Sequence, residues 1–135
     1  MIDLTIASPL HGQIFVFPAG LVGCPTWRRF RFGQGAAGPT VHRLRGIDND
    51  VSLFVVDPFT IDPDFSVELS DQEAAELGLS DPSEALVLVT LTVRESPRSV
   101  TANLLGPLIV NAATGRGRQV VLNGSPYVVR HPIAA

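Results

Sequence analysis

The chain contains no lysine, only one cysteine, and no apolar run long enough to cross a membrane. All ten basic residues are arginine. The single Cys24 excludes an intrachain disulfide and fits a reducing compartment. The longest apolar run, Ala85–Val89 with an alternating tail to Val93, falls far short of the about 20 residues that a bilayer requires. Met1–Ile6 has neither the basic start nor the cleavage site of a secretory signal. We therefore expect a cytoplasmic protein without a membrane span.

Positive charge is missing from the middle of the chain. No arginine lies between Gly46 and Val93, whereas eleven of the thirteen acidic residues lie between Asp48 and Glu84. The net charge of −3 argues against direct binding of nucleic acid. Such a segregated stretch suits a basic protein partner. The alternative is a solvated helix with its flanking turns.

The composition is that of a chain that folds on its own. Hydrophobic residues make up 45% and charged residues 17% of 135 residues. This length corresponds to one domain, which we assign to residues 1–135. Because no heptad pattern or long apolar edge is present, we expect a monomer.

Short β-branched segments separated by Gly, Pro and Asn predict strands. They are Gln13–Phe17, Leu53–Val56, Pro107–Val110 and Gln119–Leu122. Val87–Val93 alternates with a period of two, which predicts a half-buried strand. Glycines between Val110 and Gln119 and the pair Asn123-Gly124 predict turns that make antiparallel hairpins.

One helix is well signalled, at residues 70–77. Ser70 and Glu73 have the spacing of a capping box, Asp71 complements the macrodipole, and Gly78 has the position of a left-handed C-cap. So short a helix needs to pack against the sheet, and Ala74 and Leu77 are the residues expected to do so. The sequence thus predicts an all-β, mainly antiparallel fold, a small barrel or sandwich with one docked helix.

No constellation of residues indicates catalysis, a cofactor or a metal site. His11, His42 and His131 are scattered, and Cys24 is expected to act as a small buried hydrophobe. Asp57, Asp62 and Asp64 lie next to prolines, where Asx side chains cap turns. The glycine-rich segment Gly33–Gly38 precedes no helix and is expected to form a flexible loop. We therefore do not expect an enzyme, although a carboxylate-based hydrolase stays open.

The segment Phe54–Phe65 is more informative. A buried strand is expected to end at Asp57, after which two Asp-Pro steps hold the backbone extended. Phe59, Ile61 and Phe65 then alternate with acids to form a stiff, acidic rim. This rim is either a binding edge or a connection whose aromatic residues close the core. Farther along, Thr101 and Asn103 are expected to satisfy local backbone groups.

Several of these segments together resemble the FliW family of flagellar assembly factors. The similarity covers most of the chain, and the phrase at Thr101–Leu104 is its most specific part. The other matching segments are Phe17–Gly23, Arg29-Phe30, Val55–Pro58, Asp62–Phe65, Gly106-Pro107, Ile109–Asn111, Gly117–Val121, Tyr127 and Arg130–Pro132.

The resemblance implies a small antiparallel β-barrel and a non-enzymatic cytoplasmic regulator. FliW proteins bind the translational repressor CsrA and, alternatively, newly made flagellin, so that accumulated flagellin leaves CsrA free to repress flagellin translation. The alternative is a small β-domain that binds another protein or a small ligand and is unrelated to translation control.

The resemblance also suggests where the partners bind. For CsrA, whose RNA-binding surface must be basic, we expect an acidic face. It comprises Asp57, Asp62, Asp64, Glu68, Asp71, Glu73 and Glu76. For flagellin, whose helical ends are apolar, we expect exposed hydrophobes near Phe59 and Phe65 and the segment Thr101–Leu105, including Asn103 and Leu104.

Overall fold

A computed structural model describes residues 10–35, 40–95 and 97–133. The strands are β1 (Ile14–Val16), β2 (Arg29–Gln34), β3 (His42–Gly46), β4 (Ser52–Val56), β5 (Ala85–Glu95), β6 (Arg98–Ala102), β7 (Leu108–Asn111), β8 (Gly117–Gln119) and β9 (His131–Ile133). The helices are α1 (Asp71–Leu77) and the 3-10 helices η2 (Pro58–Thr60) and η3 (Pro82–Glu84). Within these ranges, no helix has the length and apolarity to span a membrane.

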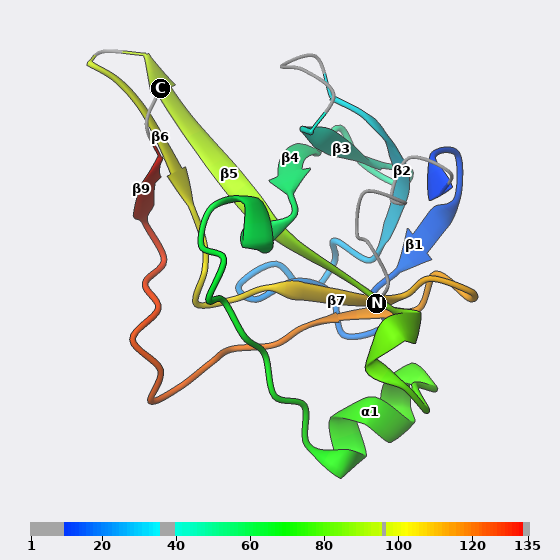
Figure 1. Ribbon diagram of the computed structural model, residues 1–135. Coiled ribbons are helices and arrows are strands. Elements are labelled where there is room, and N and C mark those ends of the chain that lie inside the picture. The colour runs from blue at the N-terminus through cyan, green and yellow to red at the C-terminus, as the bar shows by residue number, and fades with distance from the viewer. Residues whose placement is uncertain (1–9, 36–39, 96, 134–135) are drawn as a thin grey trace.

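Seven strands form a closed ring in the order β1-β2-β3-β4-β5-β7-β8 (Figure 1), and every ladder between them is antiparallel. The ring closes where Val16 forms a parallel bridge with Arg116 and donates its backbone N–H to the carbonyl oxygen of Gly115 at 2.8 Å. The mainly antiparallel, barrel-like fold expected from the sequence is therefore confirmed.

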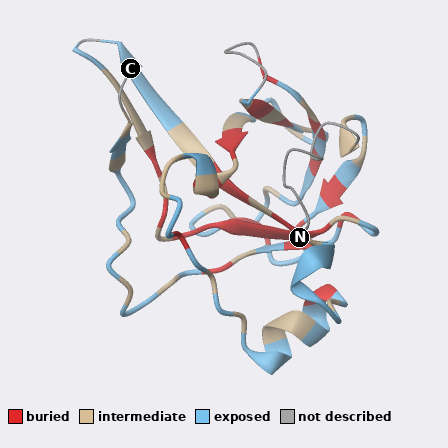
Figure 2. Cartoon of the chain, viewed as in Figure 1, coloured by how far each residue is buried: buried red, intermediate tan, exposed pale blue. Residues whose placement is uncertain are grey.

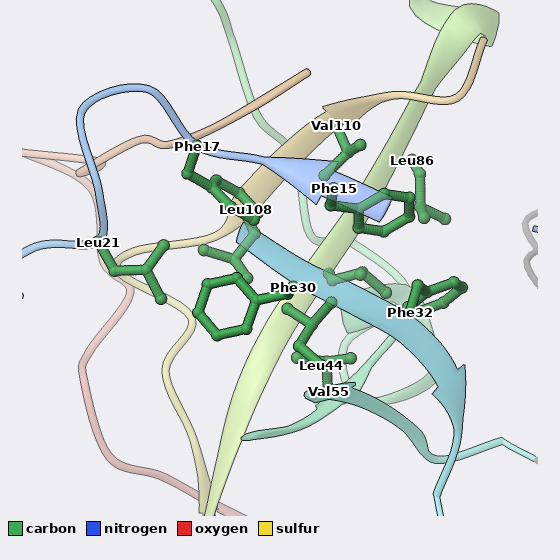
Figure 3. Close-up of a cluster of buried hydrophobic side chains, with 11 residues drawn as sticks. Phe15, Phe17, Leu21, Phe30, Phe32, Leu44, Val55, Leu86, Leu108 and Val110 are labelled. Carbon is green, nitrogen blue, oxygen red and sulfur yellow. The ribbon is translucent and has the colours of Figure 1, made fainter. Parts of the chain in front are cut away.

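Alternate residues of these strands point into the barrel and fill it (Figure 3). Four aromatic rings pack as two pairs. The ring centroids of Phe15 in β1 and Phe32 in β2 lie 4.8 Å apart. Those of Phe17, just after β1, and Phe30 in β2 lie 5.9 Å apart. The remaining buried members of this cluster are Leu21, Leu44, Val55, Leu86, Leu88, Leu108 and Val110. Each large side chain buried in this way contributes about 1.5–3 kcal/mol, so this apolar interior, aromatic and aliphatic together, stabilises the ring.

Strand β5 belongs to the barrel and also extends beyond it. Its first residues pair with β7, and its later residues pair with β4 on one side and β6 on the other (Figure 1). Strand β9 pairs with the other edge of β6. The prediction of a half-buried strand is wrong for the first half of β5, because Leu88 and Val89, which point to opposite faces, are both fully buried. Only toward its end does the strand become exposed, as at Val93 (Figure 2).

An outer layer covers the barrel at β5. The segment after β4 contributes Phe65 to a second buried cluster, whose other members are Val56, Val89, Ala102 and Leu104. The tail after β8 packs Leu122 and Tyr127 against this cluster. Tyr127 joins the two parts of this layer, since its ring lies 4.7 Å from that of Phe65 and its hydroxyl accepts a hydrogen bond from the N–H of Ser66. This layer explains why both faces of β5 are buried.

Helix α1 forms as the sequence predicts. Ser70 and Glu73 make the reciprocal capping box, and Gly78 ends the helix with a φ of 69°. Leu77 is buried against Ile109 and Val120 in a third cluster, as expected. Ala74, the other residue expected to dock the helix, is only half-buried. Leu77 is therefore the residue that anchors α1.

Two boundary predictions are wrong. The strand expected at Gln119–Leu122 lies earlier, at β8. Val120 still donates to the carbonyl oxygen of Pro107 at 2.9 Å, but Pro107 has no N–H to return a bond, so the ladder ends there. Gly33 and Gln34, expected in a loop, form the end of β2 and pair with Arg43 and His42. Residues 36–38 of that expected loop lie outside the described residues.

Candidate protein-binding surface

The acidic segment begins where β4 ends. Asp57 caps η2 by accepting a hydrogen bond from the N–H of Phe59 at 2.8 Å, and Asp62 accepts one from the N–H of Asp64 at 2.9 Å. Both are the Asx turns that the sequence predicts. The backbone is nevertheless not extended here, because Pro58 starts a 3-10 helix. The acidic segment is therefore a series of tight turns.

Two of the hydrophobes proposed for flagellin are not exposed. Phe65 has 3% and Leu104 has 1% of its surface exposed, because both belong to the second cluster. Phe59 is partly exposed and packs edge-on against Phe65, with ring centroids 5.7 Å apart. Phe65 and Leu104 therefore support the surface from beneath, whereas Phe59 and Leu105 are partly exposed and can be reached by a partner.

The segment at Thr101 is largely structural. Thr101 pairs with Thr92 and Pro132 inside the sheet. Asn103 accepts a hydrogen bond from the N–H of Gly106 at 3.0 Å, which confirms the expected local role of this side chain. Gln119 donates to the carbonyl oxygen of Gly106 at 2.9 Å. These contacts hold the turn that leads into β7.

Two acids of the segregated acidic stretch form ion pairs with arginines. Asp48 receives two hydrogen bonds from Arg29, at 2.8 and 2.6 Å, which lower the pKa of this carboxyl. Glu76 on α1 pairs with Arg118 of β8. The sequence gives no sign of either pair, since the partners lie 19 and 42 residues apart.

Other acids of the predicted face keep their negative charge exposed to partners. Asp64, Glu68 and Asp71 are exposed, and in the described part of the chain none of them forms an ion pair with an arginine. Glu73 is half-buried and accepts from the N–H of Ser70 within the capping box. The negative surface thus runs from the turn at Asp62 into the first turn of α1.

The structure brings together two histidines that the sequence leaves apart. His11 Nε2 lies 2.9 Å from His42 Nδ1, and both rings pack against Phe32. Burial lowers the pKa of His42, and the charge of a protonated His11 lowers it further. The description of these two residues as scattered is therefore wrong. No group of three or more potential metal ligands exists among the described residues, and Cys24 is half-buried against the barrel cluster.

Beside α1 lies an open, mainly apolar groove that sequence reasoning missed, here called the α1 groove. It has a volume of about 850 Å³. Its apolar lining includes Val67, Leu69, Ala74, Leu79, Val87 and Ile109, and its polar lining includes Asp57 and Asp81. These residues come from α1, β5, β7 and the turns between them, so only the folded chain unites them.

The fold and this surface define an antiparallel β-barrel protein with an acidic, helix-bearing outer layer. The family model described as FliW protein matches residues 7–133. Flagellar assembly factor FliW of Natranaerobius thermophilus is 33% identical over 139 residues, covering 96% of this chain and 92% of the relative. Flagellar assembly factor FliW of Treponema pallidum is 32% identical over 123 residues, covering 91% of this chain and 82% of the relative.

A crystal structure of the flagellar assembly factor FliW superimposes with a TM-score of 0.80 at 24% identity, covering 88% of this chain and 84% of that one. This similarity supports the fold. Together with the sequence matches, it shows that the chain belongs to the FliW family of flagellar assembly factors.

Proposed function

We propose that this protein is a cytoplasmic, non-enzymatic flagellar assembly factor that binds CsrA and flagellin in alternation. Binding of CsrA would relieve repression of flagellin mRNA, and accumulated flagellin would displace it. The support from sequence is membership of the FliW family. We further propose that the protein acts as a single-domain monomer.

The observation that carries the CsrA part is the row of exposed acids without an ion pair in the described residues, which includes Asp64, Glu68 and Asp71. A protein that binds RNA presents basic surface to the phosphates. A negative surface of this kind attracts that basic surface over about 8 Å at physiological ionic strength. The acids are therefore proposed to speed association and to orient the partner.

For flagellin, we propose that Phe59 contributes to the contact. Its ring is partly exposed and is held in place by the buried Phe65. A fixed, exposed aromatic ring beside apolar surface is suited to the apolar face of a helix. Thr101, Asn103 and Leu104 are proposed to act indirectly, by shaping the sheet behind this surface.

The test is titration calorimetry with CsrA and with flagellin from the same organism, each in the absence and presence of the other. Binding of both proteins, each weakening the other, is the expected result. Binding of flagellin alone would leave an assembly factor without the translational role, and binding of neither would refute the proposal.

Charge reversal tests the acidic surface itself. Asp64→Arg is expected to weaken CsrA binding by about tenfold at low salt, equivalent to about 1.4 kcal/mol, and by less at high salt. Glu95→Arg is the matched control, because Glu95 is an exposed acid at the far end of β5 and the charge change is the same. Equal effects of the two variants would mean that only net charge matters.

A further inference from the structure

The α1 groove exposes apolar side chains at the edge of the third hydrophobic cluster. Leu77, Ile109 and Val120 are buried in the third cluster, but Val67, Leu69 and Leu79, which pack around them, remain partly exposed. A concave apolar surface that the chain leaves uncovered is typical of a site for another molecule.

The rim of the groove carries fixed negative charge. Asp57 and Asp81 are the N-caps of η2 and η3, each followed by a proline. Asp81 accepts from the N–H of Ser83 at 2.8 Å, and hydrogen bonds from Ser83 lower the pKa of this carboxyl, so it stays ionised at neutral pH. No arginine of the described chain lines the groove. Cations on a ligand would therefore meet acids at the rim.

We propose that the α1 groove binds an amphipathic helix of another protein, whose apolar face is flanked by arginine or lysine. The small side chains of Ala74 and Ala85 leave space for larger side chains of the incoming helix. The acidic rim disfavours phosphate-rich ligands. It also disfavours α1 of a second copy, because that helix carries Asp71, Glu73 and Glu76.

The groove proposal deepens the proposed function, since Phe59, which is proposed to contact flagellin, also lines the groove, but the two proposals can fail separately. If CsrA and flagellin both fail to bind while a helical probe binds, the proposed function fails and the groove proposal stands. If both proteins bind but the probe does not, the groove proposal fails and the proposed function stands.

The probe is a fluorescein-labelled peptide of about 18 residues, long enough to form a helix, with leucines on one face and arginines beside them. One control peptide has the same composition in scrambled order, and a second has glutamate in place of arginine. Fluorescence anisotropy is expected to show binding of the probe that is at least about tenfold tighter than that of either control.

Two neighbouring alanines on α1 provide a matched pair of variants. Ala74 lines the groove, whereas Ala75 is exposed outside its lining. Ala74→Arg places bulk and a repelling charge in the groove and is expected to weaken probe binding by about tenfold or more, while Ala75→Arg changes it by less than about twofold. Arginine is a good helix former, and thermal unfolding of both variants verifies that they are folded.

The rim is tested by removing charge while keeping the caps. Asp57→Asn and Asp81→Asn retain an oxygen that can accept from the backbone N–H, and each is expected to weaken binding by about threefold at low salt and not at high salt. Asp62→Asn is the control, since Asp62 forms the same kind of turn outside the groove lining and its replacement should have no effect.

Three results would overturn the proposal. They are equal binding of the probe and the scrambled peptide, equal effects of Ala74→Arg and Ala75→Arg, and sedimentation showing a dimer of this protein that Ala74→Arg dissociates. The last result would assign the groove to a second copy of the chain.

Discussion

At the scale of single residues, Asn111 connects the end of α1 to the turn between β7 and β8. Its Nδ2 donates to the carbonyl oxygen of Leu77 at 2.9 Å, and its Oδ1 accepts from the N–H of Ala113 at 2.9 Å. Only 4% of its surface is exposed. A buried amide that serves several backbone groups is hard to replace, because each lost partner leaves a polar group without a hydrogen bond.

Asn111→Ala is therefore expected to lower the free energy of unfolding by about 2–4 kcal/mol. Urea denaturation followed by circular dichroism measures this loss. Asn123→Ala is the control, because Asn123 is an exposed turn residue and its replacement should cost less than about 0.5 kcal/mol. Similar losses for both variants would contradict the role of Asn111.

His42 should make stability depend on pH. Burial, and then the charge of His11, lower the pKa of His42 in the folded chain from its ordinary value of 6.5. The unfolded chain then binds more protons than the folded chain at mildly acidic pH. The contribution of His42 to the free energy of unfolding is fully present above pH 6.5. It decreases as the pH falls below that value, until the pH has passed the pKa of His42 in the folded chain.

The measurement is the free energy of unfolding at several pH values between 7.5 and 5.5, a window set around the ordinary pKa of about 6.5. His42→Asn keeps a hydrogen-bond acceptor but cannot be protonated in this range. This variant should be less stable at pH 7.5, because it loses the ring contact with Phe32, yet show a smaller decrease toward acid. An unchanged slope would contradict the assignment to His42.

At the scale of elements, the contact between β1 and the turn before β8 closes the barrel, and Gly115 makes it possible. Its φ is 79°, which disfavours other residues, and a Cβ at this position would overlap the carbonyl oxygen of Ile14. Gly124 has nearly the same φ of 81°, but a Cβ added there would meet no atom within 4 Å. Comparing the same substitution at these two positions therefore distinguishes the cost of backbone strain from the cost of steric overlap.

Gly124→Ala is expected to cost about 1 kcal/mol through its backbone conformation. Gly115→Ala should cost about 1–3 kcal/mol more, since β1 has to move away from the turn before β8. Thermal or urea unfolding of the two variants gives the difference. Equal costs would show that the contact between β1 and β8 yields easily.

The prediction of elements from sequence succeeded where the signals are local. The ends of α1 follow from Ser70, Glu73 and Gly78, which act within one turn of the helix. The end of β8 could not be found in this way, because Val120 is apolar and β-branched, as in a strand, and the ladder ends only because the facing residue, Pro107, has no N–H. A residue that is distant in the sequence therefore determines where β8 ends.

The same distinction applies to the surface. The Asx turns at Asp57 and Asp62 were predictable, since each carboxylate binds an N–H two residues away. That Phe65 closes the core was one of two alternatives. Its packing against Tyr127 could not be predicted, because these residues lie far apart in the sequence. The α1 groove likewise unites side chains from several elements, so no local pattern indicates it.

At the scale of the whole molecule, β5 links all three clusters. Leu88 faces the barrel, whereas Val89 and Val87 face the second and third clusters. Loss of β5 would therefore expose apolar surface on both of its sides. Separate unfolding of the barrel and of the outer layer is disfavoured for this reason.

We therefore propose that the chain unfolds as one domain, in a single transition. Differential scanning calorimetry should give equal calorimetric and van't Hoff enthalpies. Fluorescence of Trp27, which packs on the barrel cluster, and far-ultraviolet circular dichroism should report the same midpoint. Two resolved transitions would show that the outer layer melts independently.

The closure of the barrel also bears on how the protein is synthesised. Val16 and its partner Arg116 are 100 positions apart in the sequence. The ring can therefore form only after most of the chain has left the ribosome. Until then the aromatic residues near the start of the chain, including Phe15 and Phe30, have no closed interior to enter. During translation this nascent chain therefore exposes apolar surface, which makes incompletely folded chains prone to aggregate.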